Sequence, residues 1–214
     1  IEDLAVRQAI VEADGNAVVL ASAGTGKTHT IIDKIQYISE NDVASFKKIA
    51  AITFTEKAAD EIKERLHENK TESLVVSKTM HAWVLSEILQ PFLPNMSSFN
   101  FEGNIKFGFG KTKPKIKSFE EGLHHLDING EILSYVSKPK WDVDPTVSYT
   151  EDGNDFTFQL AMEVLINSQS ASDYIKCAYR WIFVDEYQDV NKDQNALIQY
   201  LIDELHIKLS LIHI

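Results

Sequence analysis

The segment Ala21–Thr28 constrains the fold of this chain most strongly, and it reads Ala-Ser-Ala-Gly-Thr-Gly-Lys-Thr. It follows the apolar run Asn16–Leu20 and precedes a helical pattern of isoleucines that begins at Ile31. Small residues between a strand and a helix let successive backbone N–H groups converge on one anion, and the helix N-terminus adds partial positive charge. The segment therefore predicts a phosphate-binding loop within an α/β fold.

Each position of this loop has an expected role toward a nucleoside triphosphate. The backbone surrounds the phosphates, Lys27 reaches the β- and γ-phosphates, and the Thr28 hydroxyl ligates Mg²⁺. The predicted nucleotide contacts are Ala23, Gly24, Thr25, Gly26, Lys27 and Thr28. Ala21 stands where the general pattern has glycine, so a simple turn before a helix is one alternative. A dinucleotide-binding turn is another, although it leaves Lys27 without a role.

Composition limits the class of protein. The 214 residues are enough for one domain, or for one domain with an insertion, and 44% of them are hydrophobic. We expect no membrane association, because no apolar run reaches the roughly 18 residues of a membrane helix. The single cysteine, Cys177, fits a reducing cytoplasmic location and excludes an internal disulfide. A net charge of −11 argues against a basic nucleic-acid coat but allows a local basic groove.

Apolar runs and helical patterns alternate along much of the chain. The runs expected to be buried strands, besides the one before the loop, are 49–54, 74–77, 181–185 and 208–212. Helical patterns lie between them, and this alternation predicts a doubly wound α/β core with a central parallel sheet.

The region 91–155 interrupts this alternation. It contains all five prolines of the chain and six of its nine glycines. Such a high density of prolines and glycines predicts an inserted subdomain with a mostly helical or irregular structure of its own. Residues 1–90 and 156–214 are then expected to form one discontinuous domain.

A second candidate half of the site follows the strand that ends at Val184. The sequence there is Asp-Glu-Tyr-Gln-Asp, and carboxylates at the C-terminal end of a buried strand lie where open α/β sheets bind ligands. Asp185 is expected to hold Mg²⁺, Glu186 to accept a proton from the attacking water, and Gln188 to relay between groups of the site. The alternative is an acidic helix start, which is favourable by itself.

Four segments together resemble the motifs of UvrD/Rep-type superfamily 1A DNA helicases. Ala21–Thr28 resembles that family's form of the phosphate loop, with alanine at its first position. Leu4–Gln8 resembles the Q motif, which implies that Gln8 recognises adenine. Ala51–Ala59 resembles motif Ia, which touches single-stranded DNA, and Asp185–Asp189 resembles motif II.

The resemblance implies a RecA-like ATP-binding domain 1A over 1–90 and 156–214, with subdomain 1B inserted at 91–155. It implies ATP and Mg²⁺ as ligands and single-stranded or duplex DNA as a partner. Residues 155–161 and 182–209 also resemble the UvrD-like helicase subunit of Gabija anti-phage systems. That finer resemblance implies a partner nuclease of the OLD/Toprim type.

The expected DNA contacts come from three segments. Thr53, Phe54 and Thr55 lie in the motif Ia resemblance, and His81 lies in Thr79–Trp83, which resembles the family's Thr-Phe-His-Ser-Phe element. By composition alone, Phe54 fits a core position as well, and Trp83 fits the apolar face of its helix. The run 106–117 has five lysines and no acid, so Lys111 and Lys113 are expected at phosphates, or alternatively on a solvated surface.

The family implies a second RecA-like domain that supplies further motifs, and His213-Ile214 departs from the expected motif III. We therefore expect a fragment that binds ATP weakly and neither hydrolyses it efficiently nor unwinds DNA. Three hypotheses remain for the parent protein: a DNA helicase motor, a regulatory subunit that controls a nuclease, and a P-loop ATPase without a nucleic-acid role.

Overall fold

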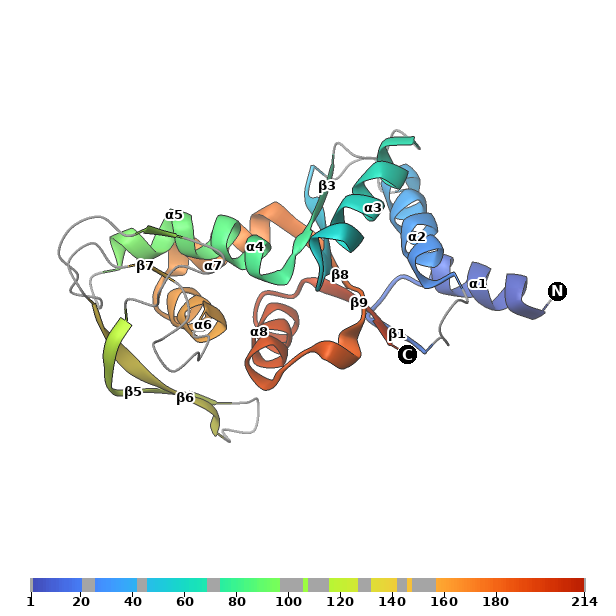
Figure 1. The fold of residues 1–214 in the computed structure, drawn as a ribbon. Helices are drawn as coiled ribbons and strands as arrows, with labels where there is room; N and C mark the ends of the chain where they lie inside the picture. The colour runs from blue at the N-terminus through green and yellow to red at the C-terminus, as the bar shows by residue number, and fades with distance from the viewer. Residues whose placement is uncertain are drawn as a thin grey trace. The chain divides into compact units, whose positions relative to one another are not determined.

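The structure is a computed structural model, drawn in Figure 1. It describes residues 2–20, 26–41, 46–68, 74–96, 106–107, 116–126, 132–141, 146–147 and 157–213. These residues belong to two compact units. The first comprises 1–80, 176–190 and 201–214, and the second comprises 81–175 and 191–200.

A five-stranded, all-parallel sheet forms the centre of the first unit. Its strand order is β1-β9-β8-β2-β3. The strands are β1 (Ala17–Leu20), β2 (Lys48–Thr53), β3 (Val75–Thr79), β8 (Tyr179–Val184) and β9 (Lys208–His213). All five strands predicted from apolar runs are confirmed, and so is the α/β class of the core. The near-continuous apolar sequence of β2 and β8 fits strands whose side chains are buried on both faces.

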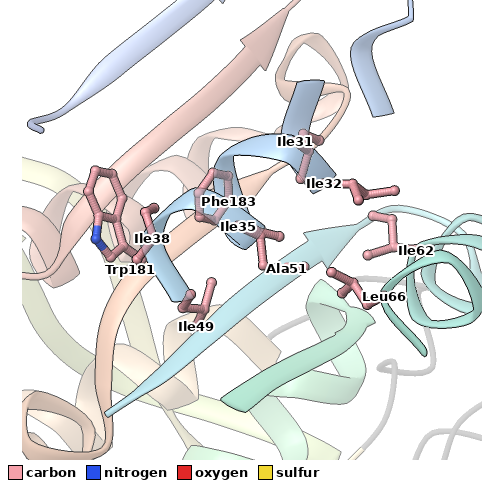
Figure 2. Close-up of a cluster of buried hydrophobic side chains, with 10 residues drawn as sticks. All are labelled: Ile31, Ile32, Ile35, Ile38, Ile49, Ala51, Ile62, Leu66, Trp181 and Phe183. Atoms are coloured by element: carbon pink, nitrogen blue, oxygen red, sulfur yellow. The ribbon is translucent and has the colours of Figure 1, made fainter. Parts of the chain in front are cut away.

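Helices α2 (Lys27–Asn41) and α3 (Glu56–Glu68) cover one face of this sheet. Figure 2 shows isoleucines of α2 meeting side chains of β2, β8 and α3. The cluster consists of Ile31, Ile32, Ile35, Ile38, Ile49, Ala51, Ile62, Leu66, Trp181 and Phe183. Spacings of three and four residues along α2 place its isoleucines on one side of the helix, which is why they enter the core together.

Helix α1 (Glu2–Glu12) lies beside α2 in the same unit (Figure 1). The first unit also contains the short 3₁₀ helix η4 (Tyr187–Asp189), which follows β8.

The second unit contains most of the remaining helical structure. Its elements are α4 (Met80–Val84, from residue 81), the π-helix η2 (Leu85–Leu89), α5 (Gln90–Phe92), η3 (Leu93–Asn95), α6 (Thr157–Asn167), most of α7 (Gln169–Ala178) and most of α8 (Lys192–Asp203). The Ser172 hydroxyl donates to the Leu165 carbonyl over 2.6 Å, and this bond joins α7 to α6.

A reciprocal pair of hydrogen bonds starts α8. The Gln194 N–H donates to Asn191 Oδ1 over 2.9 Å, and the Asn191 N–H donates to Gln194 Oε1 over 2.8 Å. This is a capping box, in which two otherwise unpaired helix N–H groups find partners.

The expectation of a mostly helical insertion is wrong for the described residues between 97 and 155, which form strands. They are β4 (Lys106–Phe107), β5 (Ile116–Leu126), β6 (Ile132–Trp141) and β7 (Thr146–Val147), and β5 pairs with β6 in an antiparallel hairpin. The stretch Ile132–Val136 is rich in residues that favour strands. Prolines and glycines also occur between strands, and here Gly122 and Pro139 lie within β5 and β6 themselves.

Within the described residues, no helix combines the length and the apolar character needed to cross a membrane.

The buried isoleucines of α2 generate the first prediction. Ile35 has no exposed surface, so Ile35→Ala should lower the free energy of unfolding by about 3 kcal/mol, since it leaves a cavity in a closely packed core. Val6 is 59% exposed on α1, and Val6→Ala should change the same quantity by less than about 0.5 kcal/mol. Urea unfolding measures both values, and equal losses for the two variants would contradict the assigned core.

Candidate functional site

The C-terminal edge of the sheet brings the two predicted halves of the site to the same side. In the parallel register, Leu20 of β1 is level with His213 of β9, and Leu211 of β9 is level with Val184 of β8. The chain therefore leaves β1 and β8 at one edge of the sheet, with only β9 between them. At the usual strand spacing, the two exits are about 10 Å apart. Ligands of open parallel sheets bind at this edge.

Helix α2 begins at Lys27, where the predicted phosphate loop ends. Gly26 has a φ of +83°, a left-handed conformation that residues with a Cβ rarely adopt. Its carbonyl accepts the Thr30 N–H over 3.0 Å and the Thr30 hydroxyl over 3.3 Å, which closes the first helical turn. Thr28 is half-buried in this turn. The glycine of the loop thus gives the chain the bend that starts the helix.

The predicted phosphate contacts lie only partly within the described residues. Ala23, Gly24 and Thr25 lie outside the described residues, and for Lys27 the structure describes the backbone alone. Their roles at the phosphates stay predictions.

Asp185 is the first residue after β8, and it is 7% exposed. Its backbone N–H donates to the Ile52 carbonyl over 3.0 Å, which continues the pairing of β8 with β2 by one residue. Its carboxylate accepts the Glu186 N–H over 3.0 Å. These contacts hold the carboxylate close to the sheet, at the edge where the chain also leaves β1.

Glu186 turns the chain away from the sheet in an unusual conformation. Its φ and ψ are 55° and 46°, in the left-handed region that costs a residue with a Cβ about 1–2 kcal/mol. The Glu186 carbonyl accepts the Asp189 N–H over 2.9 Å, and the Gln188 amide donates to the Glu186 carboxylate. Gln188 thus contacts the residue predicted as the catalytic base. The two lie in one turn with Asp185.

The donor set at this edge fits a magnesium ion bound together with a nucleotide. Among the described residues, no group of three histidine, cysteine or carboxylate side chains forms a self-sufficient metal site. Mg²⁺ instead favours one or two protein oxygens supplemented by phosphate oxygens and water. The Asp185 carboxylate and the Thr28 hydroxyl are oxygen ligands of the kind that this ion requires.

A pocket of about 370 Å³ lies between α1 and α2. Its lining residues are Leu4, Arg7, Gln8, Val11, His29 and Asp33. The Gln8 amide, predicted to read adenine, donates to the Glu12 carboxylate one turn along α1. Arg7 forms an ion pair with Asp33, which joins the two helices that form the pocket walls.

The sequence analysis predicted Gln8 as the adenine reader but assigned no role to Arg7, His29 or Asp33, which line the same pocket. His29 Nδ1 lies 3.9 Å from Asp33 Oδ1, four residues along the same helix. The sequence did offer one signal for His29, because this residue comes directly after the phosphate loop. The pairing of Arg7 with Asp33 spans 26 residues, so no local sequence pattern predicts it.

The motif Ia residues have structural contacts of their own. Thr53 is 1% exposed, and its hydroxyl donates to the Thr55 carbonyl over 3.0 Å. The Thr55 hydroxyl accepts the Ala58 N–H over 3.2 Å, which is the capping contact at the start of α3. Phe54 between them is half-buried. Their contacts with DNA stay predictions.

His81 belongs to the second unit, where its ring meets the Phe158 ring edge-on at 4.7 Å between centroids. Trp83 is fully buried, as the apolar pattern of its helix predicts. Lys111 and Lys113 lie outside the described residues.

Comparison with known proteins gives a matching family and several relatives. The model of the family described as "UvrD/REP helicase N-terminal domain" matches residues 4–106 and 149–212. The Gabija protein GajB of Bacillus cereus (strain VD045) is 34% identical over 206 residues, which cover 96% of this chain and 38% of that protein.

Named DNA helicases match as well. The ATP-dependent DNA helicase Rep of Escherichia coli (strain K12) is 27% identical, over 92% of this chain and 33% of that protein. A probable DNA helicase II homolog of Mycoplasma capricolum is 28% identical, over 90% of this chain and 31% of that protein. The chain thus spans between 31% and 38% of the length of these relatives.

The left-handed turn at Glu186 generates the second prediction. Asparagine tolerates this conformation and valine does not, so Glu186→Val should be less stable than Glu186→Asn by about 1–2 kcal/mol. Both substitutions remove the carboxylate, which isolates the effect of the backbone. Chemical denaturation of the two variants measures the difference, and equal stabilities would contradict a left-handed residue at this position.

Proposed function

The chain belongs to the UvrD/REP helicase N-terminal domain family, and from this premise we propose that it is the ATP-binding part of an ATP-dependent DNA helicase. The parent protein translocates on single-stranded DNA and unwinds duplex. The observation that carries the proposal is the shared sheet edge, where the chain leaves β1 toward α2 and leaves β8 toward the Asp185–Glu186 turn, with β9 between the two strands.

Two regions of this edge suit the two ends of ATP. The residues before α2 receive the phosphates, with Lys27 at the β- and γ-phosphates and Thr28 toward the metal ion. The pocket between α1 and α2 receives the base, with Gln8 as the adenine reader. Gln8 must release its contact with Glu12 to present its amide to the base. Because α2 borders both regions, one nucleotide can occupy them together.

Hydrolysis relies on the turn after β8. Glu186 takes a proton from the attacking water, and the contact from Gln188 orients its carboxylate. Asp185 and Thr28 hold Mg²⁺, which neutralises charge on the phosphates when it is bound. The buried position of Asp185 against β2 supports this role, since a fixed carboxylate needs little reorganisation.

We place the DNA contacts at Thr53, Phe54, Thr55, His81, Lys111 and Lys113. Half-buried Phe54 at the sheet edge supports a stacking role. Residues 1–90 and 156–214 form the RecA-like domain 1A, and 91–155 form subdomain 1B. The family model leaves out residues 107–148, which fall inside the proposed insertion. We propose a cytoplasmic location for the parent protein.

The 34% identity with a Gabija protein over nearly the whole chain favours a second candidate function. In this alternative, the parent protein senses nucleotide and DNA and controls a partner nuclease of the OLD/Toprim type.

Affinity purification of the full-length protein from its native host tests this second candidate. A nuclease that copurifies in a fixed ratio, with activity that depends on ATP level, is the expected result for the regulatory function. A protein that purifies without a nuclease and unwinds duplex alone supports the motor instead.

The third prediction concerns the phosphate loop in the full-length protein. Lys27→Ala should reduce DNA-stimulated ATPase activity by about 10²-fold or more, because the charge on the phosphates loses its partner. Glu186→Gln should reduce turnover similarly while ATP still binds, since only the proton acceptor is lost.

The matched control is Lys63→Ala, which removes an exposed lysine from α3 and should leave turnover unchanged. Unchanged turnover in Lys27→Ala would remove the phosphate-loop assignment. ATPase activity without any stimulation by single-stranded DNA would support the third hypothesis, a P-loop ATPase with no nucleic-acid role.

A further inference from the structure

Helix α1, which carries Gln8, has little apolar anchorage. Among the side chains described on α1, those of residues 4–12, Val11 alone is buried. Leu4 is 71% exposed and Val6 is 59% exposed. The usual source of helix stability, an apolar face against a core, is therefore weak for this helix. Polar contacts must determine where its residues lie.

Those polar contacts come from two consecutive residues of α2. Asp33 pairs with Arg7, in the middle of α1. Lys34 is 1% exposed, and its ammonium donates to the Ile10 carbonyl over 3.0 Å. Ile10 lies in the last turn of α1, where helix carbonyls lack partners within the helix and carry partial negative charge. A buried cation suits this place better than a neutral donor.

The ammonium of Lys34 is held on a second side by an aromatic ring. It lies 5.2 Å from the ring centroid of Trp181, the third residue of β8. Lys208 lies 5.4 Å from the same ring and pairs with Asp14, just after α1. Burial lowers the pKa of Lys34, and the charge of Asp14 opposes that effect. The contacts with the carbonyl and the ring compensate for part of the lost hydration.

We propose that Lys34 is a positioning residue for recognition of the nucleotide base. By contacting both the Ile10 carbonyl and the Trp181 ring, its ammonium fixes the last turn of α1, and with it Gln8, at a set distance from the start of α2. The distance between the phosphate contacts and the base contact then matches the length of one bound nucleotide. This inference rests on the proposed function, because it assigns a determinant of specificity for the same ATP site.

A lysine with a structural role alone would behave differently. Its loss would weaken the fold and would affect all nucleoside triphosphates equally. A positioning lysine affects the base contact and spares the phosphate contacts, which belong to the first turn of α2, about two turns before Lys34. Selectivity between ATP and GTP separates the two cases, because these nucleotides differ in the base alone.

The experiment compares Lys34→Met with the parent sequence in the full-length protein. Methionine fills similar volume without a donor or a charge. We expect KM for ATP to rise by about 5- to 10-fold, the effect of one lost hydrogen bond, with kcat within about twofold. KM for GTP should stay unchanged, so that the selectivity for ATP falls by the same factor. Lys34→Arg keeps a charged donor and should restore most of that selectivity.

The matched control is Lys47→Met. Lys47 also donates its ammonium to a carbonyl of a helix end, that of Lys176 in α7, over 2.9 Å. Its removal should leave the selectivity between ATP and GTP unchanged. Equal changes for ATP and GTP in Lys34→Met, or an unchanged KM for ATP, would overturn the proposal. If Lys34→Met does not fold, Lys34→Gln decides between the same outcomes.

A double-mutant cycle with Gln8→Ala completes the test. If Lys34 acts through Gln8, the two substitutions together should cost no more selectivity than Gln8→Ala alone. Additive losses would show that Lys34 acts by another route and would overturn the inference. Failure of the proposed function has a different signature, because the unmodified protein would then bind ATP and GTP with no preference or not at all.

Discussion

The backbone hydrogen bond from Asp185 to Ile52 extends the ladder between β8 and β2 beyond the last residue of β8. The position of the Asp185 carboxylate therefore depends on the strand pairing of the whole sheet. The same parallel register, transmitted through β9, determines where the chain leaves β1. Two segments more than 150 residues apart in the sequence thus reach one edge of the sheet. The candidate site depends on this pairing more than on any single side chain.

Helix α2 connects the sheet to the rest of that site. Its isoleucines are buried against β2, β8 and α3, and this packing fixes the helix axis. Its first turn follows the loop that we propose to bind the phosphates, and Asp33 and Lys34 hold α1. Apolar packing therefore positions α2, and α2 in turn positions a helix that has little packing of its own. A small shift of α2 would change the phosphate end and the base end together.

The sequence predicted those parts of the fold that depend on local patterns. Apolar runs identified all five strands of the sheet, and Gly26 in the loop has the left-handed backbone that its position requires. The contact between Arg7 and Asp33 joins residues that are far apart in sequence, and the burial of Lys34 also depends on distant residues. No local spacing in the sequence therefore predicts either feature. The hairpin of β5 and β6 was missed because proline and glycine punctuate strands and irregular segments alike.

The turn at Glu186 is a strained part of the first unit, and its stabilising core lies elsewhere in the same unit. The left-handed backbone there is unfavourable, and it persists because Asp185 is fixed on one side and η4 on the other. The hydrophobic cluster under α2 stabilises the fold and offsets the unfavourable backbone conformation of this turn. A relaxed turn would send the carboxylate of Glu186 in another direction, so the strain and the proposed role of that carboxylate have one structural cause.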